Sequence, residues 1–389
     1  MAKKKEIDPI FMLDFISLIE DPRIDRTKKH SLETIMIIAI CAVICGAKSW
    51  NEIEVFGEMK IDFLNNFLSL ENGVPSHDTF RRFFMLLKPE SLLEFFNNWV
   101  SSFNKEDLKQ VCIDGKTLRG SKRKGSRAIH VINAFSTGLG LSLGQLKTDE
   151  KSNEITAIPE LIKSLDIKDT LVSVDALNCQ TNIAETIISE GGDYLFCVKN
   201  NQETLKTRIE EKFESHKKGG RKNYKFEKAE EERKINHGRI EKRTVKIIKE
   251  NEGFSLGINP FNQWRNLKTI IEVYSERIDS KTGVLQESIR HYISSRDESA
   301  EYFLHAIKDH WQVENQLHWH LDVSMREDDC RCRVEHSAVN FSSIRQLALG
   351  LVKKIIVMRS RTEKMSVRTK MLKAGWDNEF LLEILLQGN

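Results

Sequence analysis

Residues 110–121 read QVCIDGKTLRGS, and this stretch decides the fold class. It opens with a short apolar run that ends in Asp114 and is followed by glycine and a basic loop. A second run of the same kind, TLVSVD at residues 170–175, also ends in an aspartate. Short runs rich in Val and Ile are typical of buried strands. We therefore predict a strand from Gln110 to Asp114 and another from Thr170 to Asp175, each with a carboxylate at its end.

The sequence around these two runs predicts an α/β fold with a mixed sheet. Strands are expected at residues 128–136 and 141–148, and Thr137-Gly-Leu-Gly140 between them suits a hairpin turn rather than a nucleotide-binding loop. The expected elements that follow are a helix at 155–165, the strand at 170–175, a helix at 182–190 and a strand at 194–198. Strands and helices in this order are typical of a mixed α/β layer.

The remaining sequence divides the chain into four predicted segments. Residues 1–106 are expected to form an all-helical N-terminal domain, with Ser31, Ser76 and Ser91 as N-caps. Residues 107–200 form the first part of the core. Residues 201–300 change to a charged helical stretch followed by alternating β-rich runs, which predicts a β-rich insertion. Residues 301–389 are expected to hold the final core helix and C-terminal helices.

A third acidic residue of interest, Glu314, lies in the predicted final helix. The segment from Glu301 to Asp322 reads as one helix. Its inward stripe consists of Phe303, Ile307, His310, Glu314, Leu317 and Leu321. A carboxylate on such a face costs several kcal/mol unless a cation or a donor meets it. Glu314 is therefore expected to have a partner, either a metal ion or an arginine at 331 or 333.

Asp114, Asp175 and Glu314 are the candidate catalytic and metal-binding residues. Hard divalent cations take oxygen ligands, and two of them about 4 Å apart activate a water molecule and stabilise a leaving oxygen in phosphodiester chemistry. Two structural alternatives stay open. Asp114 precedes a glycine, a pattern also typical of turns, and Asp175 is a distant candidate to cap the helix that begins near Thr181.

Basic residues give the candidate DNA-binding sites. The chain has 60 Lys and Arg against 57 Asp and Glu, a net charge of only +3, so a nucleic-acid surface must come from local clusters. The candidates for phosphate contacts after the two aspartates are Lys116, Arg119, Lys122, Arg123 and Lys199. Arg81 and Arg82 lie opposite three phenylalanines on a predicted capped helix, which suits either a DNA groove or a purely structural amphipathic helix.

The predicted final helix carries further polar residues beside Glu314. Trp311, Asn315, His318 and Asp322 are expected to position DNA or to support Glu314, and Asp322 is the best rival carboxylate. His310, His318 and His320 also suggest zinc, but no second pair of suitably spaced ligands accompanies them. Magnesium or manganese, with two ions, is the favoured metal.

Cysteine usage and hydropathy predict an intracellular protein. The seven cysteines are odd in number and lie mostly in apolar runs, which favours reduced, buried thiols. No signal pattern follows the N-terminal Met-Ala-Lys-Lys-Lys, and the longest apolar stretch, residues 35–47, is too short to span a bilayer. We expect a cytoplasmic protein with no membrane contact, and DNA binding through the basic clusters would associate it with the nucleoid.

Seven collinear blocks resemble those of H-repeat-associated (ISAs-type) insertion-sequence transposases, a group within the DDE superfamily. They are IAICAVICGAKSWNEIEVFG, PSHDTFRRFF, IDGKTLRGS, VDALNCQ, YLFCVKNNQ, HGRIEKR and HWQVENQLHWHLDVSMREDDCR. The resemblance places the metal-binding triad on Asp114, Asp175 and Glu314 and implies a ribonuclease H-like core. Many relatives in the superfamily carry Tyr, Arg and Lys around the final Glu. This sequence has Ile307, His310 and Leu321 instead.

The resemblance implies a DNA transposase that cuts and joins the ends of its insertion sequence. Water would act as the first nucleophile, and the freed 3′ hydroxyl would then attack target DNA by transesterification at a site with two Mg²⁺ or Mn²⁺ ions. The expected partners are double-stranded DNA and further copies of the chain, as a homodimer or a higher assembly. The alternatives are a metal-dependent nuclease of the same fold and a non-catalytic DNA-binding descendant.

Overall fold

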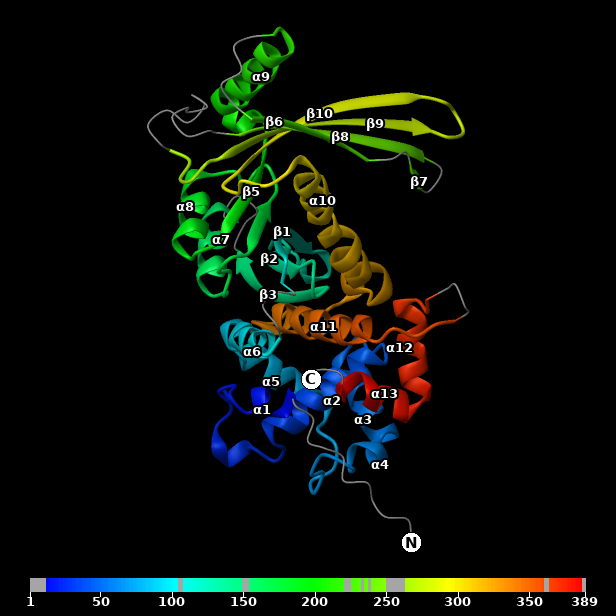
Figure 1. Cartoon of the computed structure of the whole chain (residues 1–389). Coiled ribbons are helices and arrows are strands. Elements are labelled where there is room, and N and C mark those ends of the chain that lie inside the picture. The colour runs from blue at the N-terminus through cyan, green and yellow to red at the C-terminus, as the bar shows by residue number, and fades with distance from the viewer. Residues whose placement is uncertain are drawn as a thin grey trace. The chain divides into compact units, whose positions relative to one another are not determined.

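The computed structural model describes residues 12–103, 108–148, 154–219, 225–231, 234–236, 239–249, 263–359 and 364–386 (Figure 1). The chain divides into two compact units. The first unit comprises residues 1–107, 115–153 and 314–389, and the second comprises residues 108–114 and 154–313. Two of the four divisions fall directly after Asp114 and directly before Glu314.

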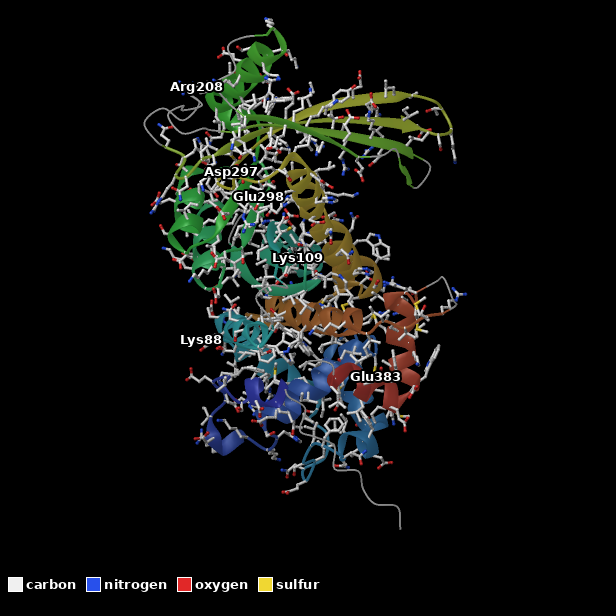
Figure 2. All side chains as sticks on the ribbon, viewed as in Figure 1. Lys88, Lys109, Arg208, Asp297, Glu298 and Glu383 are labelled. Atoms are coloured by element: carbon white, nitrogen blue, oxygen red, sulfur yellow. The ribbon has the colours of Figure 1, made fainter. Side chains whose placement is uncertain are left out.

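In the first unit, residues 12–103 form helices and contain no strand. These helices are α1 (Met12–Ile16), α2 (Leu32–Ile44), α3 (Trp50–Met59), α4 (Ile61–Leu64), α5 (His77–Leu86) and α6 (Pro89–Ser101). Ser31 and Ser76 accept hydrogen bonds from the backbone N–H groups three residues on and cap α2 and α5, as predicted. The prediction for Ser91 was wrong. The N-cap of α6 is Lys88, three residues earlier (Figure 2), because Pro89 suits the first helical position.

Helix α11 (Ser337–Lys354) is the central helix of this unit. Every residue from Ser337 to Val352 is buried, and the helix packs on α2, α5, α6 and the strand β3. Trp50 of α3 stacks on Phe84 and makes a tilted contact with Phe341 of α11, with ring centroids 5.1 and 4.6 Å apart. Two further helices, α12 (Val367–Trp376) and α13 (Asn378–Leu386), also contact α11. The predicted hairpin is confirmed, since β2 (Ile129–Ser136) pairs antiparallel with β3 (Leu141–Thr148).

The second unit is built on a large sheet flanked by helices, so the predicted mixed α/β layer is confirmed. Its strand order is β1-β4-β5-β10-β9-β8-β6. The first three strands, β1 (Gln110–Leu118), β4 (Leu171–Val174) and β5 (Asp193–Val198), are parallel. The connections between them contain α7 (Glu154–Lys163) and α8 (Thr181–Ser189). The predicted bounds of these elements agree within a few residues.

Strand β1 differs from its prediction, because it continues past Asp114 to Leu118. The pairing with β4 ends at Ile113 and Val174. Beyond it the chain keeps the alternation of an extended strand, with Lys116 and Leu118 buried and Thr117 exposed. Asp114 therefore lies within a strand, and the alternative of a turn at Asp114-Gly115 was wrong.

The segment from residue 201 to 300 adds antiparallel strands to the same sheet. It contains α9 (Glu203–Lys217), β6 (Lys225–Glu230), β7 (Lys234–Asn236), β8 (Arg239–Lys249), β9 (Thr269–Asp279) and β10 (Leu285–Ser294). Strand β10 pairs with β5, which joins these strands to the parallel ones. Near the start of α10 (Ala300–His310), Lys249 lies 3.1 Å from Glu227 and 3.0 Å from Asp297 (Figure 2).

The predicted single helix from Glu301 to Asp322 was wrong in its second half. Helix α10 ends at His310, and two π-helical turns follow at Val313–His318 and His320–Ser324. A π turn holds more residues than an α turn, so the stripe with a period of 3.6 residues does not continue unchanged. Leu317 and Leu321 are buried as expected, but the side chain of Glu314 is 63% exposed.

Two further predictions concern the cysteines and the membrane. All seven cysteines are free thiols, in agreement with the sequence. Among the described residues, no helix combines the length and the apolar character needed to cross a membrane.

Candidate metal and DNA-binding site

Asp114 and Asp175 occupy neighbouring positions in the second unit. Each directly follows one member of the register pair Ile113 and Val174. Adjacent strands of a sheet lie about 4.8 Å apart, so the backbone alone brings these two residues close together. Both are half-buried. The register therefore supplies two carboxylates at one edge of the parallel strands.

Asp175 is held by a local turn and does not cap the next helix. Its Oδ1 accepts hydrogen bonds from the Asn178 backbone N–H at 3.2 Å and from the Asn178 side chain at 3.0 Å. The N-cap of α8 is Gln180, so the capping alternative was wrong. The same Asn178 amide donates to the buried Glu154 at 2.8 Å. Asn178 thus orients Asp175, a role that sequence reasoning missed.

A cavity of about 580 Å³ lies beside Asp175 in the second unit. Its lining includes the exposed Lys199 together with Lys206 and Arg290. The Arg290 guanidinium also lies 5.2 Å from the ring centroid of Trp311, which is 47% exposed. Basic side chains around a carboxylate suit a phosphate group that approaches a metal ion.

Glu314 begins the third segment of the first unit and is hydrogen-bonded to His318. His318 Nδ1 lies 3.1 Å from Glu314 Oε2, and the imidazole is buried. This hydrogen bond lowers the pKa of Glu314 from its ordinary value, against the opposing effect of burial and with help from the positive charge of Lys116. The side chain that partners Glu314 is therefore a histidine, where the sequence suggested an arginine. Arg333, one of the two arginines considered, donates to the Gly120 carbonyl instead.

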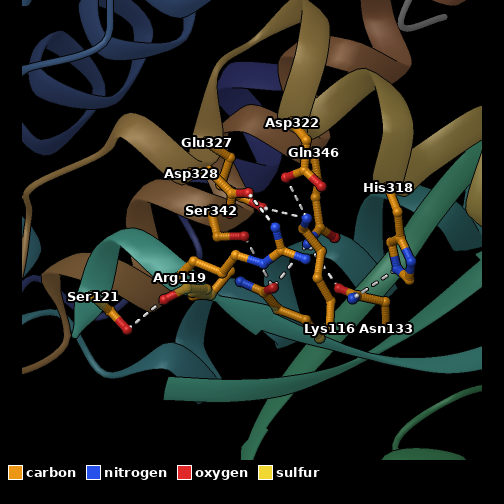
Figure 3. Close-up of polar contacts among 12 residues, drawn as sticks. Lys116, Arg119, Ser121, Asn133, His318, Asp322, Glu327, Asp328, Ser342 and Gln346 are labelled. Carbon is orange, nitrogen blue, oxygen red and sulfur yellow. Dashed lines mark hydrogen bonds and ion pairs between the residues drawn. The ribbon is translucent and has the colours of Figure 1, made fainter. Parts of the chain in front are cut away.

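Lys116 is buried in an ion-pair cluster with two acidic residues (Figure 3). Its ammonium lies 2.5 Å from Asp322 Oδ1 and 3.6 Å from Glu327 Oε2. Glu327 is itself buried. Lys116 therefore links the part of β1 after Asp114 to the chain after Glu314. Asp322, the rival carboxylate of the sequence analysis, is therefore paired with Lys116.

The basic loop after Lys116 is exposed. Arg119 is 80% exposed and lies 3.5 Å from Asp328, and both Lys122 and Arg123 are exposed. Gly120 holds this loop close to the acidic segment, because a Cβ atom there would lie 2.2 Å from the Cys330 carbonyl oxygen. The loop therefore has a fixed base and three cations available to solvent or to DNA.

The other predicted residues have separate surroundings. Arg81 and Arg82 are exposed on α5, while the phenylalanines on its other face are fully buried. Arg81 pairs with Asp78 at 3.1 Å. Asn315 is exposed on the same π turn as Glu314.

The three histidines considered for zinc have three different partners. His310 is bonded to Ser173 Oγ at 2.9 Å, and burial lowers its pKa to about 4. His318 is bonded to Glu314, and His320 to Ser324 Oγ at 3.0 Å. This arrangement does not favour a zinc centre made from these histidines.

Comparison with known proteins gives matches over most of the chain. Residues 105–351 match a family model described as a transposase DDE domain, and residues 13–100 match the model of the domain associated with it. An Escherichia coli (strain K12) protein named "H repeat-associated putative transposase YhhI" is 42% identical over 379 residues, which cover 96% of this chain and 97% of that protein. "H repeat-associated putative transposase YbfD" of the same strain is 49% identical over 205 residues, covering 52% of this chain and 81% of that protein.

One solved structure also matches, though weakly. It is a cryo-EM structure of the piggyBac transposase synaptic complex with hairpin DNA, with a TM-score of 0.41 and 11% identity. The match covers 99% of this chain and 78% of that chain. A likeness at this level carries no argument about the site.

Proposed function

Because the chain belongs to the transposase DDE domain family, we propose that it cuts DNA at the ends of its own insertion sequence and joins them to a target. The DDE domain implies the use of a divalent metal. The observation that carries the proposal is the register of β1 and β4, which sets Asp114 and Asp175 side by side at one sheet edge. Glu314 is the proposed third ligand.

The donor set fits two magnesium or manganese ions. These hard cations take oxygen ligands, and the three proposed ligands are carboxylates. The lowered pKa of Glu314 keeps it ionised at neutral pH, as a ligand must be. When bound, the ions supply Lewis acidity toward phosphate oxygens and the attacking oxygen.

The proposed reaction has two steps, which the protein arranges by orientation and charge. In the first step, water adds to a phosphorus atom at the element end, the bond from phosphorus to the 3′ oxygen breaks, and that oxygen leaves as a 3′ hydroxyl. In the second step, this hydroxyl attacks a target phosphodiester and displaces its 3′ oxygen. The number of phosphodiester bonds is conserved in the second step, so no covalent protein intermediate or external energy source is needed.

We also propose a ribonuclease H-like core for the catalytic domain. The parallel strands β1, β4 and β5 and the antiparallel hairpin of β2 and β3 support it. Helices α1 to α6 would then form the associated N-terminal domain, and β6 to β10 the insertion.

The proposed DNA contacts are the exposed cations of the site. Arg119, Lys122 and Arg123 on the loop after β1 would bind backbone phosphates, as would Lys199 at the cavity beside Asp175. Arg81 and Arg82 offer a second, weaker surface on α5. We assign Lys116 to holding Asp322 and Glu327, because its ammonium is already paired with both. Two element ends have to be joined together, which calls for a dimer or a larger assembly on DNA.

The test is nicking and strand transfer on labelled duplexes that carry the element ends, with magnesium or manganese present. Glu314→Gln is compared with the intact protein and with Glu383→Gln, a matched change at an exposed glutamate of α13 (Figure 2). Joined products that are lost only in Glu314→Gln support the proposal. Metal-dependent nicks without joining would identify a nuclease of the same fold. DNA binding without metal-dependent cleavage would identify a non-catalytic DNA-binding descendant.

A further inference from the structure

A chain of buried amide side chains runs from α11 toward Glu314 within the first unit. Figure 3 shows its part from Gln346 through Asn133 to His318. It connects the carbonyl of Val339, Gln145 on β3, Gln346 on α11, Asn133 on β2 and finally His318, with successive contacts between 2.8 and 3.4 Å. Buried side-chain amides in sheet strands cost free energy unless their hydrogen bonds are made. The nearly complete pairing here indicates a network with one preferred arrangement.

The direction of every hydrogen bond in this chain follows from its first member. The Val339 carbonyl can only accept, so the atom of Gln145 that lies 2.8 Å from it is the amide nitrogen, Nε2. Gln145 Oε1 therefore faces Gln346, whose Nε2 donates to it at 2.8 Å. The same Gln346 nitrogen donates its second hydrogen to Asn133 Oδ1, also at 2.8 Å.

The orientation of Asn133 then determines where the proton of His318 lies. Because Asn133 Oδ1 accepts from Gln346, its amide nitrogen faces His318 Nε2, at 3.4 Å. A nitrogen that receives an N–H carries no proton of its own. His318 is consequently neutral, with its one proton on Nδ1, and this proton points at Glu314 Oε2 at 3.1 Å.

We propose that Asn133 and Gln346 are positioning residues, which hold His318 as the neutral Nδ1–H tautomer so that it orients the carboxylate of Glu314. The reading of Glu314 as a metal ligand rests on the proposed function, whereas the tautomer does not. Neither Asn133 nor Gln346 touches the reacting atoms. They act through His318, and β2 and α11 set the direction of the Glu314 side chain from the far side of the imidazole.

The tautomer has two consequences for the chemistry of the site. A neutral donor engages Oε2 without cancelling the negative charge of Glu314, so the carboxylate keeps its attraction for a cation. In addition, both nitrogens of His318 are occupied, one as a donor and one as an acceptor. In this arrangement His318 orients the carboxylate of Glu314 through Nδ1, as partners that orient metal ligands do.

Long-range proton–nitrogen NMR of the imidazoles tests the tautomer directly on the full chain without DNA or metal. The His318 signals are identified by their absence from His318→Asn. We expect a protonated, pyrrole-type Nδ1 and an unprotonated, pyridine-type Nε2 near neutral pH. A proton on Nε2, or on both nitrogens, overturns the proposal.

Two distant substitutions test the relay itself. Gln346→Glu replaces a donor with an acceptor opposite Asn133, so Asn133 should turn and His318 should gain a proton on Nε2. If this buried charge prevents folding, Asn133→Leu removes the donor to Nε2 without adding a charge, and the single tautomer should give way to a mixture. Ser342→Ala is the matched control, because Ser342 contacts Gln145 from the side at 3.3 Å and should leave the tautomer unchanged. An unchanged tautomer in a folded Gln346→Glu or Asn133→Leu protein contradicts the relay.

Activity gives the second readout. Asparagine at position 318 keeps a donor at the place of Nδ1, whereas glutamine places its amide near Nε2. His318→Gln should raise the manganese concentration for half-maximal nicking by about 10-fold to 100-fold. His318→Asn should stay within about 3-fold, and the rate at saturating metal should change much less in both. Equal effects of the two changes would contradict the positioning role. A protein that nicks no DNA but shows the expected tautomer would refute the proposed function and leave the assignment of the relay intact.

Discussion

The two aspartates and the glutamate of the proposed triad are placed by different means. Asp114 and Asp175 are set by the main chain, through the register of β1 and β4 and the short turn at Asn178. Glu314 is set by side chains, because it lies on an exposed π turn and takes its direction from His318. A carboxylate placed by backbone withstands changes in its neighbours. One placed by a relay of side chains is sensitive to residues that never touch it.

The largest expected effect is the loss of either aspartate charge. In Asp175→Asn the side chain can still accept the hydrogen bonds of Asn178, so the fold should be kept while the metal ligand is lost. We expect nicking to fall by about 10³-fold, equivalent to about 4 kcal/mol, for both Asp114→Asn and Asp175→Asn. Nicking of labelled element ends measures the loss of activity, and thermal unfolding checks that the fold is kept. Activity within tenfold of the intact protein would remove these residues from the site.

Lys116→Met should be the most destabilising change near the site. It leaves the buried Glu327 and the half-buried Asp322 without their cation, and breaking a buried pair in this way costs about 3–5 kcal/mol. Arg119→Gln breaks an exposed pair and should cost about 1 kcal/mol or less. Urea unfolding measures the loss of stability in each variant. Equal losses of stability would contradict the role of Lys116 as the link between the two segments.

Glu272 lies outside the proposed site and is a second example of a carboxylate that is held by side chains. Burial alone would raise its pKa, but the nearby His291 imidazole, 3.8 Å away, and the Lys246 ammonium, which donates a hydrogen bond at 2.8 Å, lower it from 4.5 to about 2. The folded-state pKa is depressed, so the contribution to stability is present above about pH 4.5 and is lost as the pH falls toward 2. Glu272→Gln should lower the free energy of unfolding by about 1–3 kcal/mol at pH 7. The difference in the free energy of unfolding between Glu272→Gln and the intact protein should become smaller below pH 4.5. A difference that does not change with pH would contradict this account.

The smallest expected effect concerns the exposed basic loop. Arg119→Gln and Lys122→Gln each remove one proposed phosphate contact. Each should reduce the slope of log affinity against log salt by about 0.9, with little change in nicking at saturating DNA. Fluorescence anisotropy over a series of salt concentrations measures the slope. Arg26→Gln, at an exposed arginine of the N-terminal region, serves as the control. A slope unchanged in both loop variants would place the DNA elsewhere.

The same difference in placement explains what the sequence could predict. The strands before Asp114 and Asp175 are short, continuous apolar runs rich in Val and Ile, so the mixed α/β layer and its order could be predicted from local patterns. The π turns after His310 could not, because they replace a regular helix without a distinctive residue such as proline. For this reason Glu314 was expected to be buried, although its side chain is exposed.

The partners of the site residues were also beyond local patterns. Lys116 reads as one cation of a basic loop, and only the fold shows it buried against Asp322 and Glu327. Asn133 and Gln346 lie 213 positions apart in the sequence and are joined by one hydrogen bond. Asn133 is a polar amide in a largely apolar run, which indicates a buried partner but does not say which one, and Gln346 follows Arg345 with no such signal.

The central claim is that Asp114, Asp175 and Glu314 share one pair of metal ions. Iron-mediated cleavage of the protein backbone tests it most directly, since Fe²⁺ in place of Mg²⁺ generates radicals that cut the chain close to the bound ion. We predict cuts near residues 114, 175 and 314 in the DNA-bound protein, suppressed by excess Mg²⁺ and lost in Asp114→Asn. Cuts near 114 and 175 without any near 314, or cuts elsewhere, would contradict the claim.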